Sequence, residues 1–248
     1  MKSSNLVVSL SILLLILMPP LPSHPEEALK PMEILNKCID VMKGVNDYTV
    51  VVYQRQRIGE KLLPEEVMLY KFKRPNSVYL LTTGEVNHGQ EVIYREGWND
   101  GKLMAHMGGA LDGIVINVKP GSGLAKKSNR HPVNESSLIF MMDFVEKSMS
   151  YAKAHPEDNL IIEDIGTKVV FGKTVRLIRI KLPYGKDYPY YAPVSIFGID
   201  ESSFLPLYYK SYGPDGKMWE EYKYRNLKTN VGLTDLDFDP KNPKYNFQ

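Results

Sequence analysis

The sequence has little cysteine, no concentration of positive charge and no long apolar run, and each shortage excludes a class of protein. The single cysteine, Cys38, rules out an internal disulfide framework. Lys and Arg number 31 against 29 Asp and Glu and are dispersed, so the basic face that nucleic acid requires is missing and no nucleic-acid partner is expected. No apolar run approaches the ~20 residues of a membrane-spanning helix.

The sequence also lacks a recognisable metal site or catalytic set. The five histidines are scattered, and no pair has the i, i+4 spacing of a helical metal site, so no metal or other cofactor is expected. His106 lies on a predicted strand, and His88 and His131 lie in loops; they are interpreted as surface or turn histidines. Without a nucleophile or acid–base set we expect no enzyme, and an undetected hydrolase is the least favoured alternative.

Residues 1–23 have the pattern of an export signal. Lys2 precedes an apolar run over residues 6–18, which a group of prolines ends. A run of this length is typical of a signal peptide and is too short for a membrane span. Because the cleavage signal around Ser23 is poor, the sequence predicts either a cleaved signal peptide or an N-terminal anchor in contact with the membrane. Residues 24–248 contain no linker or repeat and are expected to form a single domain.

The mature chain begins with a predicted helix. Residues 30–44 carry apolar side chains at helical spacing, at Met32, Leu35, Ile39 and Met42. Pro31 is tolerated in a first turn, and Gly44 is a usual stop signal. Cys38 lies on the apolar side of this helix and is interpreted as a small buried hydrophobic residue.

From residue 48 to residue 118 the apolar period changes to two. Six short segments are each bounded by turn residues, such as Asn99-Asp100-Gly101. Because no helix separates them to form parallel crossovers, they predict an antiparallel meander. One segment places Met68, Tyr70 and Phe72 on the same face. The same β pattern resumes after residue 160.

Between these two β regions, the stretch "SSLIFMMDFVEKSM" predicts a helix over residues 137–152 with an unusually wide apolar arc. Its stripe contains Leu138, Met141, Met142, Val145, Met149 and Ala152, and Phe140, Phe144 and Tyr151 extend it. Either a curved sheet buries this surface as core, or the flexible methionines line a cavity for acyl chains. Both interpretations imply an α+β fold in which a curved antiparallel sheet wraps around two main helices.

Several stretches have a characteristic order and spacing. "TKVVFGKTVRLIRIKLP" contains a Gly-Lys turn leading into a long strand. "FGIDESSFLPLYYKSYGPDGKMWEEYKYRNLKTN" contains a Leu-Pro step and a long hairpin with Asp-Gly at its tip, and "VGLTDLDFD" closes the series. Together they resemble the periplasmic lipoprotein carrier superfamily of the LolA and LolB type. "GQEVIYREGWNDGKLMAHMGG" and "NRHPVNESS" look closer to an exported bacterial branch known only as a domain of unknown function.

The resemblance implies an unclosed half-barrel that holds acyl chains beneath a helical lid, with the helix at residues 137–152 as that lid or plug. The implied apolar pocket is lined by Met68, Tyr70, Phe72, Met141, Met142, Val145, Met149, Tyr222 and Tyr224. None of Arg55, Arg57 and Arg74 can be matched individually to the carriers' functional arginine, so that role is not transferred. Arg130-His131-Pro132 looks like a motif of the unknown-function branch and is interpreted as a capping and turn element.

The sequence therefore predicts an exported, non-enzymatic protein that binds a lipid or acyl chain, or an acylated protein, in a half-barrel cavity. The expected compartment is the periplasm of a Gram-negative-type bacterium. The alternative is an envelope interaction or lipid-sensing regulatory protein that uses the same fold to contact an envelope protein partner.

Overall fold

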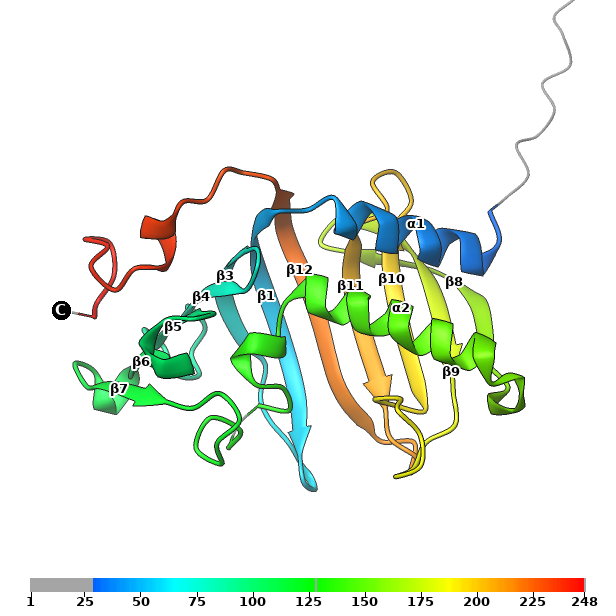
Figure 1. Cartoon of the computed structure of the whole chain (residues 1–248), viewed down its shortest axis with the longest axis horizontal. Coiled ribbons are helices and arrows are strands. Elements are labelled where there is room, and N and C mark those ends of the chain that lie inside the picture. Colours follow the sequence, from blue (N-terminus) through cyan, green and yellow to red (C-terminus); the bar gives the residue numbers. More distant parts are fainter. Residues whose placement is uncertain (1–28, 128, 248) are drawn as a thin grey trace, which may run out of the picture.

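A single open antiparallel sheet of 12 strands, with two α-helices on one face, dominates the part of the chain that the structure describes (Figure 1). This computed structural model describes residues 29–127 and 129–247. The expected α+β fold with an open, curved sheet is confirmed. The predicted export signal at residues 1–23 lies outside the described residues. None of the described helices is long and apolar enough to cross a membrane.

Two meanders form the sheet. The first consists of β1 (Asp47–Ile58), β3 (Glu66–Lys73), β4 (Ser77–Thr82), β5 (Glu91–Arg95), β6 (Leu103–His106) and β7 (Val115–Val118), and the short β2 (Lys61–Leu62) pairs with β1 alone. The second consists of β8 (Ile161–Val170), β9 (Lys173–Lys181), β10 (Val194–Asp200), β11 (Pro206–Tyr212) and β12 (Met218–Thr229). Each confirms its β-patterned segment.

Pairing between β1 and β12 joins the two meanders. The strand order is β7-β6-β5-β4-β3-β1-β12-β11-β10-β9-β8, and Val52 lies opposite Tyr224 across the junction. Residues about 170 positions apart in sequence therefore become neighbours on one surface. No local sequence pattern predicts this pairing, because strand periodicity does not specify which strands meet.

Alternation along the strands separates an inner face, covered by the helices, from an outer face. Met68, Tyr70 and Phe72 point inward and are buried, whereas the intervening Leu69 is 43% exposed. The predicted face of this strand is thus confirmed. The same period of two places Glu220, the next inward residue before Tyr222, on the inner face of β12.

Helix α1 (Pro31–Lys43) begins and ends as predicted, with Pro31 in its first turn and Gly44 at its C-terminal cap. It buries Ile34, Leu35, Cys38, Ile39 and Met42 against the sheet and α2. Met32, which the sequence pattern assigned to this stripe, is 38% exposed because it lies near the edge of the contact with the core.

Helix α2 (Leu138–Ala154) crosses the inner face over β9–β12 (Figure 1). The Ser137 hydroxyl caps it by accepting a hydrogen bond from the Phe140 N–H at 3.0 Å. The N–H of Leu138, the first residue of the helix, donates to the Tyr48 hydroxyl at 2.9 Å, which anchors the start of the helix to β1. The first turn of α2 is thereby fixed against the middle of the sheet.

Short 3₁₀ helices occur in the connections: η1 (Asn99–Gly101), η2 (Gly109–Leu111), η3 (Val133–Glu135), η4 (Pro156–Asp158) and η5 (Asp235–Phe238). The C-terminal segment that contains η5 packs on the outer face. There Phe238 and Tyr245 join Tyr79 and Ile93 in a separate apolar cluster. Tyr245 stacks on Tyr79 with ring centroids 4.0 Å apart, so the tail covers the outer surface of β4 and β5.

Candidate functional site

Two adjoining cavities lie on the inner face. Cavity 1, of about 200 Å³, lies between α2 and the strands β9–β12. Cavity 2, of about 480 Å³, lies between β1, the strands β3–β7 and the loop at residues 119–136. His131, Ser136, Tyr222 and Tyr224 line both and are called the partition residues below. Small-molecule sites are typically clefts of roughly 300–1,000 Å³, so the two adjoining spaces together reach that range.

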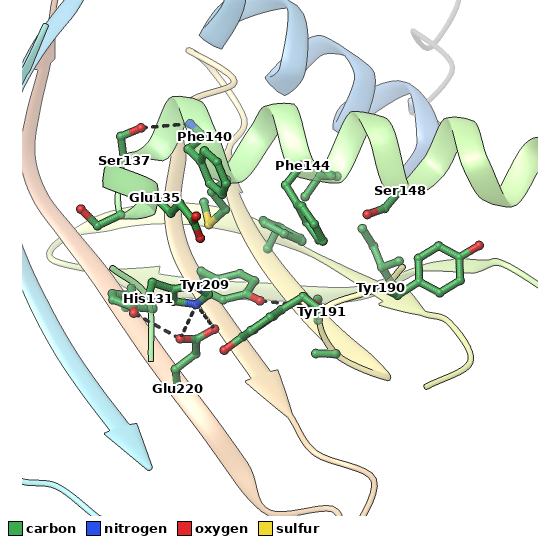
Figure 2. Close-up of a pocket in the computed structure, with 18 of the residues that line it drawn as sticks. His131, Glu135, Ser137, Phe140, Phe144, Ser148, Tyr190, Tyr191, Tyr209 and Glu220 are labelled. Atoms are coloured by element: carbon green, nitrogen blue, oxygen red, sulfur yellow. Dashed lines mark hydrogen bonds and ion pairs between the residues drawn. The ribbon is translucent and has the colours of Figure 1, made fainter. Parts of the chain in front are cut away.

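Helix α2 presents two apolar surfaces to different neighbours. Leu138, Ile139, Met142, Val145 and Ala152 are buried, and Met142, at 1% exposed, is part of the main core. At about 100° per residue, Phe140, Met141, Phe144 and Ser148 point in another direction, and they line cavity 1. Figure 2 shows Phe144 and Ser148 directed from the helix toward the sheet. The wide apolar arc therefore serves both core packing and the cavity wall.

The remaining cavity walls are also mainly apolar. In cavity 1 the sheet contributes Ile180, Leu182 and Phe197, and the connection between β9 and β10 adds Tyr190 and Tyr191. In cavity 2 the apolar lining comes from Val50, Val52, Met68, Leu80, Val92, Leu103, Ala105, Ile116 and Val118. Such surfaces favour an apolar guest, because burying it releases water from both partners.

A buried carboxylate interrupts the apolar wall of cavity 1. Glu220 on β12 has no exposed surface. Its oxygens accept hydrogen bonds from Ser211 at 3.3 Å and from the Tyr222 hydroxyl at 3.2 Å, and His131 Nε2 lies 3.2 Å from Oε2. The imidazole nitrogen and the carboxylate oxygen are thus within hydrogen-bonding distance. Figure 2 shows this contact at one end of the cavity.

The loop that carries His131 is tied to the sheet by its neighbour Arg130. The Arg130 N–H donates to Gln56 Oε1 at 2.9 Å, and Gln56 Nε2 in turn donates to the Tyr222 hydroxyl. The Arg130 guanidinium donates to the Tyr191 hydroxyl at 2.7 Å and lies 4.4 Å from the Trp219 ring centroid. Arg130 thus positions the loop, and its positive charge also acts on Tyr191 and Tyr209 in the wall of cavity 1.

The tyrosines around Glu220 stay protonated at physiological pH. Burial, reinforced by the negative charge of Glu220, raises the pKa of Tyr209, Tyr222 and Tyr224 above its ordinary value. The pKa of Tyr191 is raised by burial and by Glu220, although Arg130 opposes the rise. These hydroxyls therefore act as neutral hydrogen-bonding groups beside a negative charge.

The predicted pocket residues fall into four groups. Met141, Val145 and Met149 line cavity 1, Met68 and Tyr70 line cavity 2, and Tyr222 and Tyr224 line both. Phe72 and Met142 line neither of these cavities. Phe72 is 2% exposed and stacks on Tyr48 with centroids 5.4 Å apart, so it belongs to the packed core.

Sequence reasoning missed the polar part of the site. The interpretation of His106 as a surface or turn histidine is wrong, because it is buried on β6 at 4% exposed. His131 lies in a loop as expected, but its ring also lines both cavities and contacts Glu220. The alternation Glu220, Tyr222, Tyr224 along one strand contained a usable signal, since an acidic residue in phase with inward tyrosines predicts a buried carboxylate. Phe140 and Phe144 were placed on the apolar arc but not against the pocket.

The other arginines and possible metal ligands lie elsewhere. Arg57 donates to the carbonyl oxygens of Met218 and Glu60, Arg74 donates to that of Val45, and neither lines these cavities. Arg55 also lies outside both cavities. Within residues 29–127 and 129–247 no three His, Cys, Asp or Glu side chains are grouped to hold a metal ion.

The family comparison agrees with the expected branch. The family described as "Protein of unknown function (DUF1571)" matches residues 45–247, which is most of the chain. No curated protein matches the sequence significantly.

Solved structures with a similar arrangement include members of the superfamily that the sequence resembles. Lipoprotein LppX of Mycobacterium tuberculosis is 12% identical, with a TM-score of 0.49 over 84% of this chain and 98% of that one. A LolA superfamily protein from Nitrosomonas europaea is 12% identical, with a TM-score of 0.33 over 86% and 98%. The MucA/MucB complex of Pseudomonas aeruginosa contains a chain that is 12% identical, with a TM-score of 0.46 over 84% and 60%.

Proposed function

Starting from the fact that the chain belongs to the DUF1571 family, whose description assigns no function, we propose that this protein is a non-enzymatic carrier of an apolar ligand. The ligand is a lipid or an acyl chain, free or attached to a protein, and it occupies the two cavities on the inner face. We further propose that the chain is exported to the bacterial periplasm through its N-terminal signal or anchor.

The observation that carries this proposal is the hollow between α2 and the sheet. Protein interiors are normally packed to crystal-like density, with few voids larger than a water molecule. Here cavities of about 200 and 480 Å³ adjoin each other and have mainly apolar walls. Phe140 and Phe144 of α2 border this space, as does Met141, which also packs against the main core.

Binding would be driven by removing apolar surface from water. Each buried methylene contributes about 0.8 kcal/mol, so an acyl chain of roughly ten methylenes gains enough to exceed the cost of immobilising it. Met141 and Met149 can adjust their rotamers to ligands of different shape, because methionine is unbranched and flexible. The partition residues would lie against the part of the ligand that passes between the cavities.

The polar groups in the site support a binding role better than a catalytic one. Ser211, Glu220 and His131 are close together, but the carboxylate lies between the other two and contacts both. Nucleophilic catalysis needs the imidazole next to the serine hydroxyl, so that the base can take its proton.

The test is ligand recovery and dye binding. Protein purified without detergent should carry lipid that native mass spectrometry detects, and after delipidation it should bind the uncharged apolar dye N-phenyl-1-naphthylamine. Repeated recovery of empty protein that does not bind the dye would refute the carrier function and favour contact with an envelope protein partner.

Two tryptophan variants of α2 locate the binding. Ser148 lines cavity 1, whereas Ser150 lies two residues away on the exposed side of the same helix. Ser148→Trp should fill cavity 1 and weaken dye binding at least about ten-fold, by the loss of roughly 1.4 kcal/mol of binding free energy. Ser150→Trp is the matched control and should bind as wild type does. Equal affinities for the two variants would place the ligand elsewhere.

A further inference from the structure

Glu220 places an acidic side chain in a mainly apolar wall, where it contacts Ser211, Tyr222 and His131. Its side chain is fully buried in the wall of cavity 1, next to the aromatic rings of Tyr209, Tyr222 and Tyr224. Burying a carboxylate in such a place is unfavourable unless strong partners compensate for the lost water. An apolar residue of similar volume would fill this position more stably if packing were its only role.

The partners that Glu220 has inside the protein are held at long distances. The donors from Ser211, Tyr222 and His131 all lie between 3.2 and 3.4 Å from a carboxylate oxygen. Hydrogen bonds to a carboxylate are commonly about 2.5–2.9 Å. The acceptor capacity of Glu220 is therefore used only loosely. Because its side chain has no exposed surface, a ligand donor reaches it by displacing one of these donors, and the partly exposed His131 ring, which lines both cavities, is the donor placed for this exchange.

The charge around cavity 1 is negative. Among the described residues that line it, Glu135 and Glu220 are acidic, His131 is the one basic side chain, and none is lysine or arginine. The nearest arginine, Arg130, directs its guanidinium toward Tyr191, Trp219 and the carbonyl oxygen of Arg57. An anionic group that entered this cavity would meet the Glu220 carboxylate in the wall itself, whereas the positive charge of Arg130 lies one residue farther out, beyond the Tyr191 hydroxyl.

Building on the carrier function, we propose that Glu220 and His131 form the polar recognition point of the cavity, which selects amphiphiles whose uncharged polar end donates a hydrogen bond and rejects anionic ones. A monoacylglycerol is the simplest ligand of this class. Its hydroxyl donates to Glu220 while its acyl chain lies along the apolar wall. A free fatty acid is disfavoured, since its carboxylate would repel Glu220 at short range.

The position of the cluster suits this role. His131 and Tyr222 are partition residues, so the cluster around Glu220 lies where the two cavities adjoin. The positions of Tyr222 and of the loop that carries His131 are also fixed, because Gln56 forms hydrogen bonds with both the Tyr222 hydroxyl and the Arg130 backbone. This anchoring orients the recognition point before the ligand arrives, which improves discrimination between similar ligands.

The experiment compares two competitors that share one acyl chain. Myristate and monomyristoylglycerol, each below its critical micelle concentration, displace N-phenyl-1-naphthylamine from the full-length delipidated protein. For the wild type we expect monomyristoylglycerol to bind at least about ten-fold tighter than myristate. Glu220→Gln should reduce this ratio to about two-fold or less, mainly by tightening the binding of myristate. A gain for myristate without an equal gain for monomyristoylglycerol separates lost repulsion from misfolding, because apolar surface exposed by misfolding would bind both competitors.

Glu135→Gln is the matched control. Glu135 also lines cavity 1, but it is partly exposed, so water screens its charge and the ratio should stay near that of the wild type. Equal binding of the two competitors by the wild type would overturn the proposal, as would an unchanged ratio in Glu220→Gln. In both cases dye binding would leave the carrier function standing. Failure of the wild type to bind the dye would instead refute the carrier function and, with it, this recognition point.

Discussion

Two adjacent methionines on α2 allow a direct test of its two apolar surfaces. Met142 is 1% exposed and lies in the main core, whereas Met141 is only partly buried and lines cavity 1. Replacing each by alanine removes the same atoms from neighbouring positions of one helix. Any difference between the two variants therefore reports their surroundings.

The two variants should differ in stability. Truncating a buried methionine to alanine typically costs about 2–5 kcal/mol, through lost burial and the void that remains, and Met142→Ala should fall in this range. Met141 already faces an open space on one side, so Met141→Ala should cost about 1 kcal/mol or less. Urea unfolding followed by circular dichroism measures both values.

Ligand binding should show the opposite order. Full burial of a methionine side chain contributes roughly 1.5–3 kcal/mol, so a ligand that covers about half of Met141 loses about 1 kcal/mol when the side chain is removed. Met141→Ala should therefore weaken dye binding about five-fold, and Met142→Ala should change it less than about two-fold. The assignment of the two surfaces is refuted if Met141→Ala is as unstable as Met142→Ala and binds the dye as the wild type does.

Two further predictions concern the framework of the site. Burial raises the pKa of Asp200, but hydrogen bonds from Ser202 and Ser203, with the nearby Lys173, outweigh it and hold that pKa at about 2. Because the folded pKa is below the unfolded value of about 3.9, the carboxylate stabilises the fold above pH ~4 and loses this effect as the pH falls through about 2. Asp200→Asn should be less stable by about 2 kcal/mol at pH 7 in urea unfolding, with the difference shrinking below pH ~4; a pH-independent difference would contradict this origin. Ser137→Ala removes the N-terminal cap of α2 and should lower the unfolding free energy by about 1 kcal/mol. Ser137→Gly should lower it by only a few tenths of a kcal/mol. Equal stability of Ser137→Ala and the wild type would exclude the capping role.

Much of the fold follows from local patterns in the sequence. The period of two placed Met68, Tyr70 and Phe72 on one buried face, and the helical period with Pro31 and Gly44 correctly bounded α1. These predictions succeed because side-chain direction depends on the backbone geometry of a few neighbouring residues. Met32 was assigned wrongly, because whether a helix edge is covered depends on the element that packs beside it.

The candidate site was predictable only in part. Met141, Val145 and Met149 lie against a cavity as expected, but Met142, from the same apolar arc, is core. A helical wheel gives the direction of each side chain and carries no information on whether a strand or an empty space lies there. For the same reason His131 was read as a turn residue, since its partner Glu220 is 89 residues away in the sequence.

By itself, the amino-acid sequence determined where strands and helices occur, which strand faces are apolar, and that α2 has more apolar surface than one packing contact requires. These properties arise from interactions within a few residues. The tertiary structure decided that β1 pairs with β12, that the loop at residues 130 and 131 brings His131 to Glu220, and that space remains beneath α2. Long-range strand pairing and the curvature of the sheet set these features. They determine how far α2 lies from the sheet, whereas the local sequence determines only the character of each surface by itself.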